Sequence, residues 1–127
     1  MDNVKKENKC GIEIYDYTGD DYQTAVRFGS WRVAYLNHAA RFDKANFEKV
    51  ERHNESDEVF VLLTGKATLI IGEELHEIEM EPHKLYNVPK GVWHHIFTQE
   101  DTSVLIVENE DTGDDNSEFL YISDLSK

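Results

Sequence analysis

The sequence predicts an all-β domain, built as a sandwich or a barrel. Short apolar runs rich in Val, Ile, Tyr, Phe and Trp recur along the 127 residues, with turn residues between them. Several runs alternate polar and apolar positions, which is typical of half-buried strands. No segment carries a convincing apolar stripe at helical spacing. A chain of this length favours one domain, so we expect a single domain over residues 1–127.

The expected elements follow one another along the chain. Residues 1–10 are polar and are predicted to be a solvated, flexible start. The segment 22–37 is divided into two strands by Gly29 and Ser30, and 38–49 is expected to form at most a turn. The other strands are expected at residues 11–17, 47–53, 58–65, 66–72, 75–81, 84–89, 94–99, 103–109 and 119–123.

The charge of the chain limits its partners. Thirteen Lys and Arg residues stand against 26 Asp and Glu residues, for a net charge of −13. Because phosphate binding requires a basic surface, this argues against nucleic acid and anionic membranes as partners. We expect no membrane span and no signal peptide, since long apolar runs are missing. The single cysteine excludes a disulfide framework within the chain, and we expect a cytoplasmic protein.

Side chains that can bind metal gather where two predicted strands begin. His53 and Glu58 flank the turn that leads into one strand. His94 begins another strand, directly after a turn in which Pro89 fixes φ and Gly91 permits a positive φ. The turn therefore delivers the histidine onto the strand in a defined direction.

The alternation of strands indicates which side chains share a face. Lys49, Glu51 and His53 lie on one face of their strand, and His94 lies opposite to His95. If the inner faces meet in a barrel, four potential ligands converge: Glu51, His53, Glu58 and His94. Imidazole and carboxylate ligands together suit a divalent transition metal, namely Fe, Mn, Ni or Zn.

The first group of these residues resembles a motif of the cupin superfamily, the RmlC-like jelly rolls. That motif reads G-x5-H-x-H-x4-E-x6-G. His53, Glu58 and Gly65 match its second histidine, its glutamate and its closing glycine. Glu51 stands where the first histidine belongs, and Ala45 stands where the opening glycine belongs. The change from histidine to glutamate keeps a potential metal ligand but makes it harder.

The second group resembles the other cupin motif, G-x5-P-x-G-x2-H-x3-N. Pro89, Gly91 and His94 match it, while His83 and Thr98 replace its first and last residues. The two motifs and the strands between them cover about residues 47–108. The resemblance implies a jelly-roll β-barrel, also called a double-stranded β-helix, that forms a homodimer. It also implies a metal held by His53, Glu58, His94 and Glu51.

Two charged residues have more than one interpretation. Glu51 is a metal ligand, a general base, or a surface charge paired with Lys49 or Arg52. Lys49 either binds a carboxylate or enolate of the substrate or neutralises the nearby carboxylates. Glu51 and Lys49 are therefore the candidate catalytic residues. Glu55 and Asp57 are expected to be solvated turn residues.

Aromatic residues near the motifs are candidates for a substrate pocket, although aromatics in β proteins more often belong to the core. The candidates are Phe60, Tyr86, Trp93 and Tyr35, and Trp93 is the best candidate for the rim. His95 is expected to point away from the site and to have a structural or interface role.

Two classes of function fit this sequence. The first is an enzyme whose divalent metal acts as a Lewis acid or redox centre on a small oxygen-rich metabolite, as in an isomerase, lyase or dioxygenase. The second is a cupin that binds or senses a small ligand without catalysis, which would fit the altered first histidine. Fold alone does not separate them, because one fold carries many functions.

Overall fold

In the computed structural model, which describes residues 4–125, nearly all of the regular structure is β-strand. The helical pieces are single turns: η1 (Ala40–Phe42), η2 (Lys44–Asn46), η3 (Asp114–Asn116) and α1 (Ile122–Leu125). The strands are β1 (Val4–Lys9), β2 (Ile12–Tyr17), β3 (Asp21–Phe28), β4 (Trp31–Asn37), β5 (Lys49–His53), β6 (Glu58–Thr64), β7 (Ala67–Ile71), β8 (His76–Glu79), β9 (Tyr86–Val88), β10 (His94–Thr98), β11 (Ser103–Asn109) and β12 (Ser117–Tyr121).

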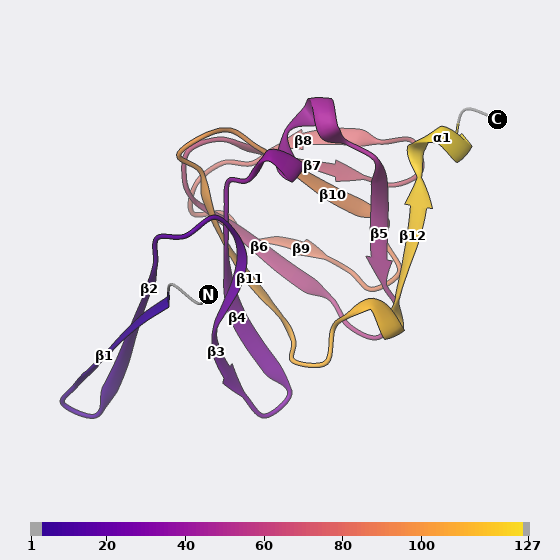
Figure 1. The fold of residues 1–127 in the computed structure, drawn as a ribbon. Helices are drawn as coiled ribbons and strands as arrows, with labels where there is room; N and C mark the ends of the chain where they lie inside the picture. The colour runs from indigo at the N-terminus through magenta and orange to yellow at the C-terminus, as the bar shows by residue number, and fades with distance from the viewer. Residues whose placement is uncertain (1–3, 126–127) are drawn as a thin grey trace.

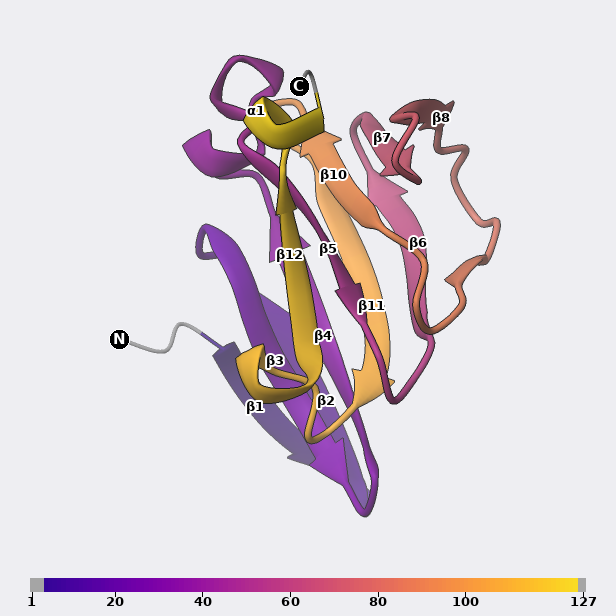
Figure 2. The same ribbon diagram turned by 90° about the vertical axis from the view of Figure 1, so that its right-hand side faces the viewer.

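Two five-stranded antiparallel sheets face each other (Figures 1 and 2). The first has the order β12-β5-β10-β7-β8, and the second has the order β3-β4-β11-β6-β9. Strands that are distant in the sequence lie side by side in both sheets, as in a jelly roll. This arrangement confirms the all-β barrel that the sequence predicts. Among the described residues, no helix is long and apolar enough to cross a membrane.

The main core lies between the two sheets and follows the alternation of the strands. In β6, Phe60 and Leu62 point inward and are buried, whereas Val59 and Val61 point outward and are half-buried. The same alternation in β11 buries Val104 and the side chains two and four positions further on. Since inward positions of small barrels are filled by side chains, a polar residue at such a position is an exception that needs a reason.

A second apolar cluster covers the opposite face of the first sheet. Val50, Ile70 and Phe97 form its buried centre. Phe47 and Trp93 pack against that centre from the sides. This cluster gives β5, β10 and β7 an apolar outer face behind the site described below.

The N-terminal segment departs from the prediction in one respect. Residues 5–9 are exposed, as expected for a solvated start, but they form β1, which pairs with β2 along its whole length. Cys10 and Gly11 make the two-residue turn with φ of 53° and 84°, the positive values that such hairpin turns require. Residues 1–3 lie outside the described part of the chain. Figure 1 shows this hairpin standing off one side of the two sheets.

Candidate metal centre and its cavity

The turn between β9 and β10 brings the two motif histidines together. Gly91 has a φ of +81° and no atom near the position of a Cβ, so the backbone conformation, and not space, favours glycine there. The Gly91 N–H donates a hydrogen bond of 2.8 Å to the carbonyl of His53 at the end of β5. Asp57 accepts a hydrogen bond from the Lys90 N–H at 2.9 Å, so this exposed residue helps to fix the turn.

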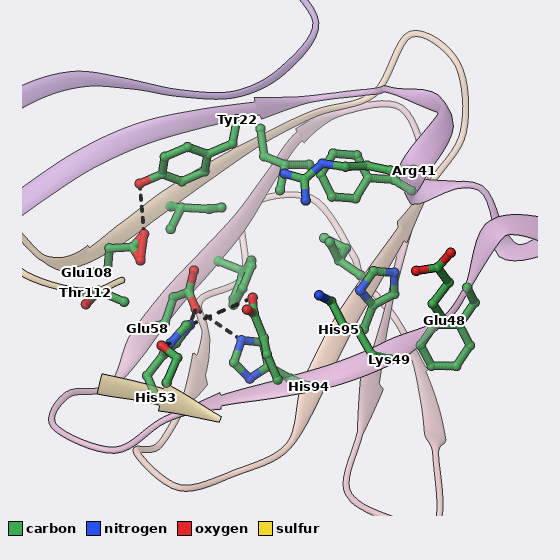
Figure 3. Close-up of a pocket in the computed structure, with 18 of the residues that line it drawn as sticks. Tyr22, Arg41, Glu48, Lys49, His53, Glu58, His94, His95, Glu108 and Thr112 are labelled. Atoms are coloured by element: carbon green, nitrogen blue, oxygen red, sulfur yellow. Dashed lines mark hydrogen bonds and ion pairs between the residues drawn. The ribbon is translucent and has the colours of Figure 1, made fainter. Parts of the chain in front are cut away.

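Three side chains of the cupin motifs converge on one carboxylate oxygen. Glu58 Oε1 lies 3.0 Å from His53 Nε2 and 3.2 Å from His94 Nε2. Figure 3 shows these three side chains pointing toward one another from β5, β6 and β10. Glu51 lies farther out, with its Oε1 4.0 Å from His53 Nε2 and a side chain that is 42% exposed. Its Cα is paired with that of His94 in the sheet.

Both imidazoles are oriented by hydrogen bonds on their outer nitrogens. His94 Nδ1 lies 3.0 Å from the carbonyl oxygen of Val92, which can only accept. His53 Nδ1 lies 2.7 Å from Ser117 Oγ, and that hydroxyl already donates its hydrogen to the carbonyl of Gly113. Nδ1 must therefore be the donor in both rings. Each Nε2 is left to face Glu58, with either a proton or a cation between them.

The three groups shift one another's acidity. Burial disfavours the charged imidazoles, but the hydrogen bonds and negative charge of Glu58 outweigh it and raise the pKa of both His53 and His94. Burial likewise opposes the charged carboxylate, yet the two imidazoles lower the pKa of Glu58 to about 2. The cluster therefore keeps an ionised carboxylate in a buried place, where a positive partner is required.

The donor set fits a divalent transition metal. Two imidazoles whose Nδ1 atoms are tied outward and a buried carboxylate match the arrangement in which outer hydrogen bonds fix metal-binding histidines. Glu51, His53 and His94 each offer an atom within 4.8 Å of the other two, so Glu51 is also within reach of an ion. Mixed imidazole and carboxylate ligands suit Fe, Mn, Ni or Zn.

The cluster lies in the wall of a cavity of about 810 Å³ between the sheets. Lys49 and Glu51 line its β5 side, and Arg41 and Phe42 line the part formed by the segment after β4. Polar and apolar side chains therefore both face the cavity, as in sites that bind small molecules.

Lys49 faces this cavity without an acidic partner among the described residues. Its Nζ lies 4.4 Å from the ring centre of Phe119 and 5.5 Å from that of Tyr121, both on β12. Arg52, the other cation considered for Glu51, binds Glu118 instead at 2.8 Å. The geometry therefore does not support pairing of Glu51 with either cation, and Lys49 remains available to an anionic group.

Of the four predicted pocket aromatics, Phe60 lines the cavity, with its ring centre 5.9 Å from that of His94. The other three do not line it, and the prediction is corrected for them. Tyr35 lies on the outward face of β4, where its hydroxyl donates to the carbonyl of Tyr15. Tyr86 packs on the core and its hydroxyl accepts the Glu81 N–H. Trp93 belongs to the outer cluster.

His95 follows His94 on β10 with the opposite side-chain parity, but it also lines the cavity and does not simply point away from the site (Figure 3). It stacks on Phe47 with ring centres 5.0 Å apart and meets Phe97 edge-on. Burial, followed by the positive charge of Arg41, lowers the pKa of His95 to about 4. Its Nε2 is buried without a hydrogen-bond partner among the described residues. His95 is thus a neutral imidazole within an aromatic cluster.

Sequence reasoning missed a further acidic residue of the cavity, the buried Glu108 on β11. It is 7% exposed and lies directly across from Glu58 in the pairing of β11 with β6. Tyr22 donates a hydrogen bond of 2.9 Å to its Oε2, and Arg32 Nη2 lies 3.4 Å from its Oε1. Burial, and then the charge of Glu58, raise the pKa of Glu108 to about 7. The sequence did contain a signal for this residue: Glu108 lies two positions after Ile106 in a predicted strand, so both side chains share the buried face.

A protein-family sequence model, described as the cupin domain, matches residues 41–108 of this chain. The matched segment includes His53, Glu58 and His94. This chain belongs to the cupin domain family. No curated protein sequence matches it.

Solved structures with the same fold are distant in sequence from this cupin. A Pac13 variant from Streptomyces with uridine has a TM-score of 0.61 and 11% identity, over 94% of this chain and 85% of its own. A cupin-2 domain protein from Shewanella frigidimarina has a TM-score of 0.58 and 19% identity, over 74% and 85%. KdgF from Halomonas sp. has a TM-score of 0.55 and 13% identity, over 74% and 80%. At such identities the likeness establishes the fold alone.

Proposed function

We propose that this cupin is a metal-dependent enzyme that acts on a small oxygen-rich metabolite, in a reaction of isomerase, lyase or dioxygenase type. The observation that carries the proposal is the orientation of His53 and His94. Both rings donate outward through Nδ1 and direct Nε2 at the same buried oxygen of Glu58. A structural salt bridge needs one such contact, whereas two imidazoles and a carboxylate that converge form a ligand set that metal sites use.

The residues around a bound ion would have different roles. His53, Glu58 and His94 would hold the ion, which would supply Lewis-acid or redox chemistry to a substrate oxygen. Glu51, partly exposed beside them, is placed to accept or return a proton as a general base. Lys49 would bind a carboxylate or enolate of the substrate, because its ammonium faces the cavity without an acidic partner among the described residues.

The size of the cavity supports a small metabolite as the substrate. Its volume of about 810 Å³ falls within the range of small-molecule sites. A structural neighbour, Pac13, has been solved with uridine and is described as a nucleoside dehydratase. Substrates of that size and oxygen content would fit the cavity of this chain, with an oxygen near Glu58 and an anionic group near Lys49.

Elemental analysis tests the proposal. Untagged protein purified without chelator should contain a stoichiometric transition metal, and His53→Ala should lose it. His76→Ala is the matched control, because His76 is an exposed histidine away from the cavity. A protein that contains no metal, and that takes up no added Mn, Fe, Ni or Zn, would contradict the proposal. That result would favour the alternative of a non-catalytic cupin that binds or senses a small ligand.

We also propose that the protein is a homodimer. The outward side chains of β6 and β11, namely Val59, Val61, Leu105 and Val107, are only half-buried. Leu63, on the same face, is 40% exposed. An apolar sheet face of this kind is normally covered. Sedimentation should give twice the 14.8 kDa mass of one chain at micromolar concentration, and the mass of one chain would contradict the proposal. The cytoplasmic location stays a prediction.

A further inference from the structure

His53 stands where two groups of potential ligand atoms meet. In the outer group, one atom each of Glu51, His53 and His94 lies within 4.8 Å of the others. In the inner group, the same holds for His53, Glu58 and Glu108. Glu108 is not one of the residues that the cupin motifs specify, so the inner group adds a carboxylate from another strand. We propose that Glu108 is a direct ligand of the ion and that Glu51 is left free at the cavity mouth.

The pairing of β6 with β11 explains why the two inner carboxylates are adjacent. Glu58 and Glu108 are direct partners in the antiparallel register, and both side chains point inward. Side chains at paired positions of neighbouring strands are about 5 Å apart at Cβ. Two buried carboxylates so close repel each other unless positive charge lies between or beside them. Arg32 and the two imidazoles supply part of that charge, and a divalent ion in the inner group would supply more.

The partners of Glu108 leave one of its oxygens available. Tyr22 donates to Oε2 at 2.9 Å. Oε1 has the longer contact of 3.4 Å with Arg32 Nη2. The guanidinium is held mainly by the carbonyls of Glu110 and Thr112, both at 2.9 Å. A carboxylate oxygen can accept several hydrogen bonds or bind a metal ion, so Oε1 can still act as a metal ligand.

Burial favours Glu108 over Glu51 as a ligand. The side chain of Glu108 is 4% exposed, whereas that of Glu51 is 42% exposed. A buried carboxylate interacts more strongly with a cation because the surrounding dielectric is lower. Packing has also already ordered its side chain, so less conformational entropy is lost when the ion binds. With two carboxylates in the inner group, the site should prefer Mn²⁺ or Fe²⁺ to softer ions.

The inference rests on the proposed function in one respect: it requires that the chain binds a divalent ion. Mn²⁺ is the probe, because free Mn²⁺ is counted by its electron paramagnetic resonance and bound Mn²⁺ reports its water ligands through proton relaxation. The metal-free full chain is titrated with MnCl2. Matched variants remove each carboxylate, Glu108→Ala and Glu51→Ala. Glu108→Asp keeps the charge but withdraws it by one methylene.

We expect Glu108→Ala and Glu108→Asp each to weaken Mn²⁺ binding by about tenfold or more and to add one water to the ion. Glu51→Ala should bind within about threefold of the wild type and add no water. If Glu108→Asp binds like the wild type, Glu108 acts only through its charge and the inference is overturned. It is also overturned if Glu51→Ala, and not Glu108→Ala, adds the water.

Two further results separate the inference from the proposed function. If the wild type binds no Mn²⁺ or other divalent transition metal, the proposed function fails and the inference fails with it. If the wild type binds Mn²⁺ and the Glu108 variants match it in affinity and in water number, only the inference fails. Circular dichroism and thermal unfolding monitor folding, and Glu108→Asp, the smaller change, carries the test if Glu108→Ala does not fold.

Discussion

His94 and His95 are neighbours in sequence, yet they lie in opposite environments on the two faces of β10. His94 faces the cavity, where Glu58 raises its pKa. His95 faces the aromatic cluster, where burial lowers its pKa to about 4. The peptide between them is the same, and the side-chain period of two alone separates them. The difference teaches that an imidazole takes its chemistry from the face it occupies.

The largest expected effect is on metal affinity, and it distinguishes His94 from His95. His94→Gln should lower the affinity for a divalent metal by about a hundredfold or more, because one ligand is lost. His95→Gln should leave the affinity within about threefold, since the ring lies on the other face. Isothermal titration with Zn²⁺ or Mn²⁺ measures both. Equal losses in the two variants would contradict the assignment of the inner face to the metal.

The pH dependence of folding stability tests the environment of His95. The folded pKa of His95, about 4, lies below its ordinary value of 6.5. A lowered pKa means that the unfolded chain binds the proton first, so stability is full above pH 6.5 and falls as the pH drops toward 4. After allowance for partial exposure, the loss is on the order of 2 kcal/mol. His53 and His94 do not contribute to this loss of stability at low pH. Their pKa values are raised in the folded protein, so the stability that they contribute is lost only as the pH rises above 6.5.

His95→Phe should remove this loss and keep the aromatic packing. Urea unfolding of the metal-free protein at pH 7 and pH 5 measures the change, and the comparison with the wild type cancels the other titrating groups. His76→Phe, at an exposed histidine, serves as the control. The same pH dependence in His95→Phe and the wild type would show that His95 is not the source.

Two valines compare the packing of the two faces. Val50 lies in the outer cluster and Val104 in the inner core, and both are fully buried. Each change to alanine should lower the free energy of unfolding by about 1–2 kcal/mol, through lost burial and a small cavity. Denaturant unfolding measures both. A negligible cost for Val50→Ala would mean that the outer cluster is not a true second core.

The smallest expected effect concerns the hydrogen bond that orients His53. Ser117→Ala removes the acceptor of the Nδ1 hydrogen, so metal affinity should fall by about tenfold. Ser103→Ala is the matched control, because Ser103 binds Asn37 away from the cavity. Titration with the same ion measures both. An unchanged affinity in Ser117→Ala would show that packing alone orients the ring.

Much of the fold could be predicted because strands impose a simple period on the sequence. The expected strands all occur, and the segment 38–49 forms short turns as expected. Some strand boundaries differ from the predicted ones, because pairing with a neighbouring strand decides where a strand begins. For example, β12 begins at Ser117, which pairs with His53, and not at Phe119. The polar start could not be foreseen as a strand, because β1 exists through its pairing with β2 and buries little.

The sequence by itself determined the strand pattern and the motif residues, because period and spacing are local properties. His53, Glu58 and His94 therefore lie where their spacing predicts. Tertiary structure decided the rest. Glu108 becomes a neighbour of Glu58 only through the pairing of β11 with β6, strands that are far apart in the chain. Whether a carboxylate lies at the exposed mouth or in the buried interior follows from which strands meet, and no local pattern encodes that.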